Sequence, residues 1–299
     1  MAELIGWLAM SHGPQLMVPP ERWDLLHNRH GEALPVRPEL VGETLADKVA
    51  KWQRCKEAID HLRRKLAAWA PDVLVVVADD QHENIQDDAN PPFTVYVGEN
   101  FEASVSLSYF KEPKSANRTA YKTDPALAQG LLEQLMETGF DPAYSKLLRY
   151  EGGLGHAFAR VLKFLTPDAG LPVVPIMVNT YYPPAPSAKR CVAFGTALAS
   201  AIRQVPGNRR IAVVGSGGLS HTIIDETLDH GVIAAIKAND LDALGALTAS
   251  QLTAGTSEIR NWIVTAAAAN RPATVVDYVP CYRIPTGVGC GMGFAYWEG

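Results

Sequence analysis

The stretch DVLVVVADDQHENIQDD, residues 72 to 88, decides the fold. Residues 73 to 77 are a short apolar run of four valines and one leucine, which follows Pro71. A run of this length and composition predicts a strand covered on both faces, as in parallel sheets that lie between layers of helices. Five polar residues follow at 79 to 83, so the sequence predicts charged groups at the carboxyl end of a buried strand.

Strands and helices alternate on both sides of this run. Further strands are predicted at 4–10, 93–97, 173–178, 210–214, 274–284 and 292–297, and helices at 40–69, 127–136, 157–165, 188–205, 226–248 and 257–269. This alternation predicts an α/β fold, with a single layered domain over residues 1–299 and a central, mostly parallel or mixed sheet. Residues 84–92 and 100–124 are expected to be polar surface loops.

The composition excludes several classes of protein. The chain has 299 residues, a net charge of −5 and 47% hydrophobic residues. A mildly acidic chain without a basic stripe predicts no nucleic-acid partner. No apolar run approaches the roughly 20 residues of a membrane helix, so no membrane partner is expected. The four cysteines are widely spaced without a CxxC pair, which predicts reduced thiols in a cytoplasmic protein.

Three of the eight histidines closely follow apolar strands. They are His12 in LIGWLAMSH, His82 in VLVVVADDQH and His221 in IAVVGSGGLSH. Ligands of layered α/β proteins bind beyond the carboxyl ends of the strands, so these three imidazoles are expected to converge on one crevice. A single histidine in such a place is usually a structural hydrogen-bonding residue, and only the coincidence of three favours a site.

Imidazoles at such an edge suit a divalent transition metal. Two histidines and one carboxylate can occupy one face of a ferrous ion and leave open positions for substrate and dioxygen. Glu258, in the first turn of an Ala-rich helix, is a candidate for the carboxylate. An acidic residue is also favourable there simply because it complements the helix dipole, so the residue alone leaves both interpretations open.

Two other motifs near residue 220 are weaker signals. VVGSGGLS, residues 213 to 220, partly matches a dinucleotide-binding turn, but a helix is predicted where that motif needs a second strand and an acid. Ser220 and His221 are adjacent, which does not suit a nucleophile and its base, and no GxSxG motif is present.

Together these residues resemble the class III extradiol ring-cleaving dioxygenases of the protocatechuate 4,5-dioxygenase catalytic-subunit type. The resemblance rests on MSHGP at the start, DDQH at 79–82, LGH at 154–156, VNTYYPPAPSAKRCVAFG at 178–195, GSGGLSH at 215–221, EIRNW at 258–262 and YRIP at 282–285. These blocks span almost the whole chain in the family's order. The first two are most similar to the branch with 3-O-methylgallate and gallate dioxygenases.

The resemblance implies an Fe(2+) cofactor and a set of site residues. It implies His12, His82 and Glu258 as metal ligands, His221 as catalytic base, and His156 as a second catalytic histidine. For the substrate it suggests Tyr181, Tyr182 and Thr286 as contacts. Asp80 is a candidate for orienting a ligand histidine, with loop capping as the equal alternative. His27, His30, His61 and His230 match nothing in the family pattern and are expected to be structural or solvated.

The implied partners are an aromatic diol of the protocatechuate, gallate or 3-O-methylgallate kind and dioxygen, in a homodimer or higher homo-oligomer. A substrate carboxylate would need a cation or several hydroxyl and amide donors, and the sequence offers Arg149, Arg190, Arg283 and Lys189 as cations without placing any of them. Two alternatives stay open: a metal-free binding protein on the same fold, and a zinc-dependent hydrolase that uses the same three ligands.

Overall fold

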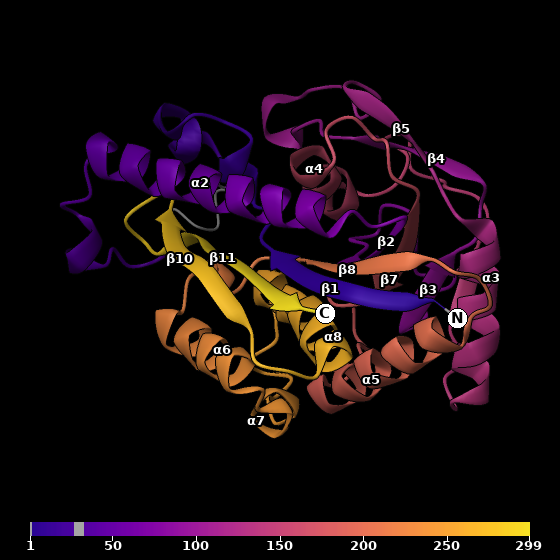
Figure 1. Ribbon diagram of the computed structural model, residues 1–299. Helices are drawn as coiled ribbons and strands as arrows, with labels where there is room; N and C mark the ends of the chain where they lie inside the picture. The colour runs from indigo at the N-terminus through magenta and orange to yellow at the C-terminus, as the bar shows by residue number, and fades with distance from the viewer. Residues whose placement is uncertain (1, 27–32) are drawn as a thin grey trace.

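The computed structural model describes residues 2–26 and 33–299, in which nine strands form one sheet (Figure 1). Their order is β10-β11-β1-β8-β2-β7-β3-β6, and β9 pairs with β11. The strands are β1 (Glu3–Met10), β2 (Val73–Asp79), β3 (Phe93–Tyr96), β6 (Ala143–Ser145), β7 (Val173–Val178), β8 (Arg210–Ser216), β9 (His221–Ile223), β10 (Thr274–Tyr282) and β11 (Val288–Glu298). A separate two-stranded sheet contains β4 (Asn100–Ser104) and β5 (Arg118–Lys122).

The centre of the sheet is parallel and its flanks are mixed. Strands β1, β8, β2 and β7 pair in parallel, whereas β11 and β3 join this group in antiparallel fashion. All residues of β2 are buried, as expected for a central strand between two helical layers. The predicted α/β fold with a mixed sheet is therefore confirmed.

Helices cover both faces of the sheet (Figure 1). One layer contains α2 (Leu45–Trp69) and α4 (His156–Leu165). The other contains α3 (Pro125–Glu137), α5 (Ala188–Gln204) and α8 (Ile259–Ala269), with α6 (Glu226–Ala238) and α7 (Leu241–Gly245) beside it. Side chains of β1 alternate between the two cores: Trp7 and Ala9 face α5 and α8, while Leu8 and Met10 face α2 and α4.

Several predicted boundaries differ from the structure for identifiable reasons. The helix predicted at 40–69 begins at Leu45, because Thr44 and Asp47 form a capping box. The helix predicted at 226–248 is divided after α6 by Asn239 in a left-handed conformation. The predicted loop at 100–124 instead contains β4 and β5. In β4 the residues NFEAS alternate, with Phe101 and Ala103 buried, which is a strand signal, whereas β5 is mostly exposed and shows no such pattern. No helix of the described residues has the length and apolar character needed to span a membrane.

Candidate functional site

A cavity of about 460 Å³ opens at the carboxyl ends of the parallel strands. Its lining comes from segments far apart in the sequence, including the residues that follow β1, β2 and β8, the first turn of α4, and the 3₁₀ turn η5 (Ala254–Glu258) before α8. Strands β1, β8 and β2 are parallel neighbours, so their carboxyl ends meet at one edge of the sheet. The crevice therefore lies where a layered α/β protein binds its ligands.

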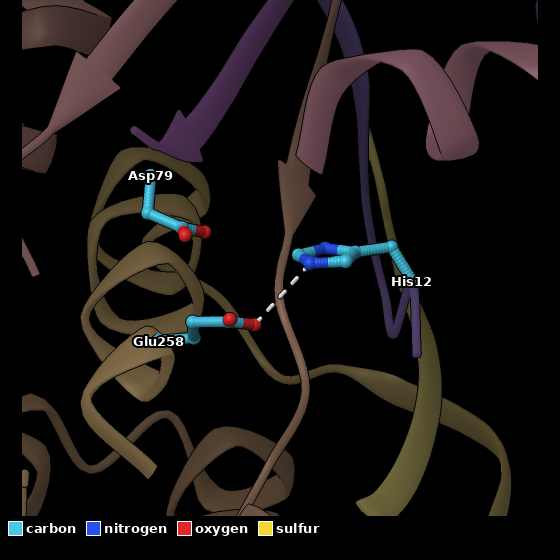
Figure 2. Close-up of side chains that lie close together, drawn as sticks. All are labelled: His12, Asp79 and Glu258. Carbon is cyan, nitrogen blue, oxygen red and sulfur yellow. Dashed lines mark ion pairs between the residues drawn. The ribbon is translucent and has the colours of Figure 1, made fainter. Parts of the chain in front are cut away.

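Three buried side chains at this edge could hold a metal ion (Figure 2). They are His12 after β1, Asp79 at the end of β2, and Glu258 at the start of α8, and their nearest ligand atoms lie within 4.8 Å of one another. Figure 2 shows the two carboxylates on one side, with the imidazole of His12 facing Glu258. The distance from His12 Nε2 to Glu258 Oε2 is 3.6 Å.

The hydrogen bonds of His12 determine which ring nitrogen is free. The Ser216 hydroxyl donates its proton to the Ala157 carbonyl at 2.6 Å, so it can only accept from His12 Nδ1, which lies 3.0 Å away. Burial lowers the pKa of His12 to about 3, so the ring is neutral and Nε2 carries a lone pair. That lone pair faces a carboxylate with no proton between the two, an arrangement that suits a bound cation.

The acidic part of the group is held by neutral donors. Glu258 accepts from the Gly218 amide at 2.8 Å, and the Gln81 amide donates to both Glu258 and Asp79 at 3.0 Å. Asn261 donates to the other oxygen of Asp79 at 3.2 Å. Burial raises the pKa of Asp79, and the neighbouring Glu258 carboxylate raises it further. Burial also raises the pKa of Glu258, but His221, which lies within hydrogen-bond distance, and the Gly218 amide outweigh this effect and lower it to about 2.

His221 lines the cavity and contacts the same oxygen of Glu258 as Gln81 does. Its Nδ1 is 3.0 Å from the Leu219 carbonyl, which can only accept, so Nδ1 carries a proton. Its Nε2 is 3.1 Å from Glu258 Oε1. Burial lowers the pKa of His221, whereas the Glu258 carboxylate raises it by more, so it lies above its ordinary value. The proton that can be exchanged with a ligand is therefore the one on Nε2.

His156 is oriented by Glu83. The Glu83 carboxylate lies 3.0 Å from His156 Nδ1 and also accepts from the His156 backbone amide at the start of α4. The ring meets His12 edge to face, with 5.3 Å between centroids. Burial lowers the pKa of His156, but Glu83 outweighs this effect and raises it above its ordinary value. A carboxylate on Nδ1 leaves Nε2 as the nitrogen available to a ligand.

The structure does not bring His82 into the group of His12 and Glu258. Its ring stacks on Tyr182 with centroids 3.3 Å apart, and its Nε2 is 3.4 Å from Asp87 Oδ1. Its backbone is left-handed, with φ at 55°, which is uncommon for a residue other than glycine. His82 as a ligand thus stays a prediction, and Asp79 is the acid that the structure places beside the pair.

The other predicted residues are placed as follows. Tyr181 lines the cavity, while Tyr182 and Thr286 are absent from its lining. Asp80 accepts from the backbone amides of Asn84 and Ile85, which is the loop-capping alternative.

Two further histidines of the described residues, and the serine beside His221, lie in structural settings. His61 stacks on Tyr296 and His230 meets the ring of Tyr278. His27 and His30 lie outside the described residues. The hydroxyl of Ser220 donates to Asp229 rather than to His221, which argues against a nucleophile there.

Four residues at the site were not selected from the sequence: Asp79, Gln81, Glu83 and Arg160. The first three belong to the polar run at 79–83, which begins with the last residue of β2 and in which the sequence pointed only to His82 and Asp80. Arg160 had a usable signal, since it lies four residues after His156 on α4 and therefore on the same helix face.

A family model described as "Catalytic LigB subunit of aromatic ring-opening dioxygenase" matches residues 37–293. Curated relatives include a 2,3-dihydroxyphenylpropionate/2,3-dihydroxicinnamic acid 1,2-dioxygenase of Rhodococcus sp, 30% identical over 55% of this chain and 48% of that protein. The protein of the same name from Klebsiella pneumoniae (strain 342) is 29% identical over 53% of this chain and 46% of its own length. The matches thus span about half the length of these relatives. A crystal structure of an uncharacterized Escherichia coli K12 protein aligns with a TM-score of 0.48 at 16% identity, covering 98% of this chain and 100% of that one.

Proposed function

Because the chain belongs to the family of the catalytic LigB subunit of aromatic ring-opening dioxygenases, we propose that it is an extradiol dioxygenase. Its substrate in this proposal is a catechol-type diol, whose ring is opened with dioxygen at a ferrous ion. Bound in the cavity, ferrous iron supplies open coordination positions for the diol and dioxygen and a path for electrons between them. A cytoplasmic homodimer or larger homo-oligomer stays a prediction from the sequence.

His12 and Glu258 would hold the ion, together with a third ligand from the segment after β2. Asp79 is already beside the pair, and His82, three residues later, is the ligand that the resemblance implies. Gln81 lies between these two positions and donates to both carboxylates. The left-handed backbone of His82 marks the place where this short segment is under strain.

The two other histidines would handle protons. A catechol must lose protons to chelate a metal, and His221 would accept one from a hydroxyl in the cavity at Nε2 when that nitrogen carries no proton of its own. The Leu219 carbonyl fixes its ring through Nδ1, so the proton enters and leaves at one defined atom. His156, fixed by Glu83, would donate a hydrogen bond to the substrate from the same cavity.

One observation carries the proposal: the unprotonated Nε2 of His12 faces the Glu258 carboxylate at 3.6 Å in a buried cavity that His221 and His156 also line. Two groups that both carry lone pairs gain little from direct contact. Both would be stabilised as ligands of a divalent cation.

The experiment is anaerobic reconstitution with ferrous iron, followed by metal analysis and oxygen uptake. The diols to compare are protocatechuate, gallate, 3-O-methylgallate and the 2,3-dihydroxyphenylpropionate named for the relatives. We expect one iron per chain and oxygen uptake with at least one diol, accompanied by a new absorbance from the opened ring. Glu258→Gln is the matched variant, since it keeps the shape but removes the charge.

The two alternatives give different results in this experiment. A folded protein that takes up no iron would be a binding protein on this fold. Hydrolytic activity restored by zinc and not by ferrous iron would indicate a zinc-dependent hydrolase. Either result would overturn the proposal.

A further inference from the structure

Two arginines line the same cavity as the histidines. Arg160 lies on α4, one turn after His156, and Arg283 directly follows β10. Their side chains belong to residues that are only 6% and 8% exposed. Arginines are seldom buried to this degree unless an anion or several hydrogen-bond acceptors compensate the charge.

Neither guanidinium has a carboxylate within ion-pair distance among the described residues. Arg160 donates to the His12 carbonyl at 3.3 Å, and its Nε is buried without a partner. Arg283 donates to the Leu26 carbonyl and to Gln15 Oε1, and its Nε is likewise without a partner. A guanidinium has five N–H groups, so both side chains keep donors that the described residues leave unused.

The surroundings explain what such a pair could bind. The two positive charges repel each other across the cavity, and Tyr109, whose ring centroid is 5.9 Å from Arg283 Cζ, lines the wall beside them. Glu83 and Glu258 attract Arg160 from beyond ion-pair distance, but they are already engaged with His156 and His221. An anion between the arginines would offset their repulsion and accept hydrogen bonds from the N–H groups that have no acceptor.

We propose that Arg160 and Arg283 bind a carboxylate carried by the diol substrate, an inference that rests on the proposed function. The planar fork of an arginine matches the two oxygens of a carboxylate better than an ammonium does. Because Arg160 bonds to the backbone of His12, a carboxylate bound there lies beside the metal-binding group. The substituent would thus fix which edge of the aromatic ring meets the catalytic histidines.

The test compares each acid with its uncharged methyl ester. Protocatechuate and 2,3-dihydroxyphenylpropionate give a short and a longer side chain. Binding is measured by anaerobic calorimetry on the iron-loaded protein, where no turnover occurs, and oxygen uptake is measured separately. We expect the wild type to bind one of the acids at least about 10-fold more tightly than its ester, as charge-assisted hydrogen bonds do.

The variants are Arg160→Met and Arg283→Met, with Arg63→Met as a control on the exposed face of α2. Each cavity variant should weaken binding of the preferred acid by about 10- to 100-fold and leave the ester within about 3-fold. Arg160→Lys and Arg283→Lys keep the charge and provide a second measurement if a methionine variant fails to fold. Their loss should be smaller than that of the methionine variants.

Equal binding of acid and ester for both diols by the wild type would overturn the inference, as would equal weakening of acid and ester in the variants. If the ester is opened as fast as the acid, the proposed function stands and the carboxylate site fails. If the protein retains no iron and consumes no oxygen with any diol, the proposed function fails and the inference falls with it.

Discussion

At the scale of single residues, Glu83 is the part of the site whose role depends most on orientation. It holds both the ring and the backbone amide of His156, so it fixes the direction in which the other ring nitrogen points. We expect Glu83→Gln to lower kcat about 10- to 100-fold, as the loss of such orienting carboxylates does. Iron content and melting temperature should stay near those of the wild type, because Glu83 is not a predicted ligand. Glu133→Gln, on an exposed position of α3, is the control. An unchanged kcat would show that His156 needs no such support.

The ligand set is a second prediction at this scale. His12→Ala and Glu258→Ala should each lose iron while the far-ultraviolet circular dichroism is retained. We expect His82→Ala to lose iron too, because two histidines and one carboxylate are the usual ferrous set. Asp79→Asn should retain iron, since Asn261 and Gln81 already occupy the oxygens of Asp79. The reverse pattern in metal analysis would identify Asp79 as the third ligand.

The positions of these residues along the chain are predictable from the sequence, whereas the directions of their side chains are not. Residues that follow a buried strand can be recognised from the apolar run before them, which is how His12 and His221 were found. The direction of a side chain three residues into a loop depends on backbone angles that no local pattern specifies. His82 therefore lies against Tyr182, and the neighbouring Asp79 and Gln81 face Glu258.

At the scale of elements, the contact between α5 and α8 determines where Glu258 lies. A Cβ on Gly195 would lie 2.2 Å from the Val264 carbonyl oxygen of α8 and 2.9 Å from Ala267 Cβ. Gly195→Ala would push the two helices apart, and we expect a loss of about 1–3 kcal/mol in the free energy of unfolding. Urea unfolding measures this loss of stability. Iron affinity is a second readout, because α8 begins directly after the predicted metal ligand Glu258.

Gly231 on α6 is the matched control for this substitution. A Cβ there would have nothing within 4 Å, and the residue lies inside a regular helix. Gly231→Ala should therefore stabilise the protein by about 1 kcal/mol, through helix propensity alone. If both substitutions were neutral, the close approach of α5 and α8 would not be needed for stability.

The elements themselves were predictable to different degrees. Strands such as β2 and β7 are continuous apolar runs, and helices such as α5 have clear periodicity and caps, so both kinds are visible in the sequence. The strands β6 and β9 have three residues each and are only partly buried. They form because a neighbouring strand offers a free edge, which is a tertiary effect that a local pattern cannot reveal.

At the scale of the whole molecule, Asp229 links segments that are far apart in the sequence. This buried residue of α6 accepts from the amide and hydroxyl of Ser220, which follows β8, and from the hydroxyl of Tyr278 on β10. These hydrogen bonds hold in place the segment after β8 that carries His221. Burial raises the pKa of Asp229 to about 6, although its three hydrogen bonds oppose that effect.

This raised pKa makes stability depend on pH in a defined direction. Between the ordinary pKa of an aspartate, about 4, and about 6 the folded protein binds more protons at Asp229 than the unfolded chain does. The contribution of this group to stability is thus complete below pH 4 and is lost as the pH rises through 6, by roughly 3 kcal/mol at most. Urea unfolding of the wild type and of Asp229→Asn between pH 4 and 8 isolates the contribution of Asp229. The contributions of all other groups cancel when the unfolding free energies of the two proteins are subtracted. The wild type should lose stability relative to the variant across this window, and parallel pH profiles for the two proteins would contradict the assignment.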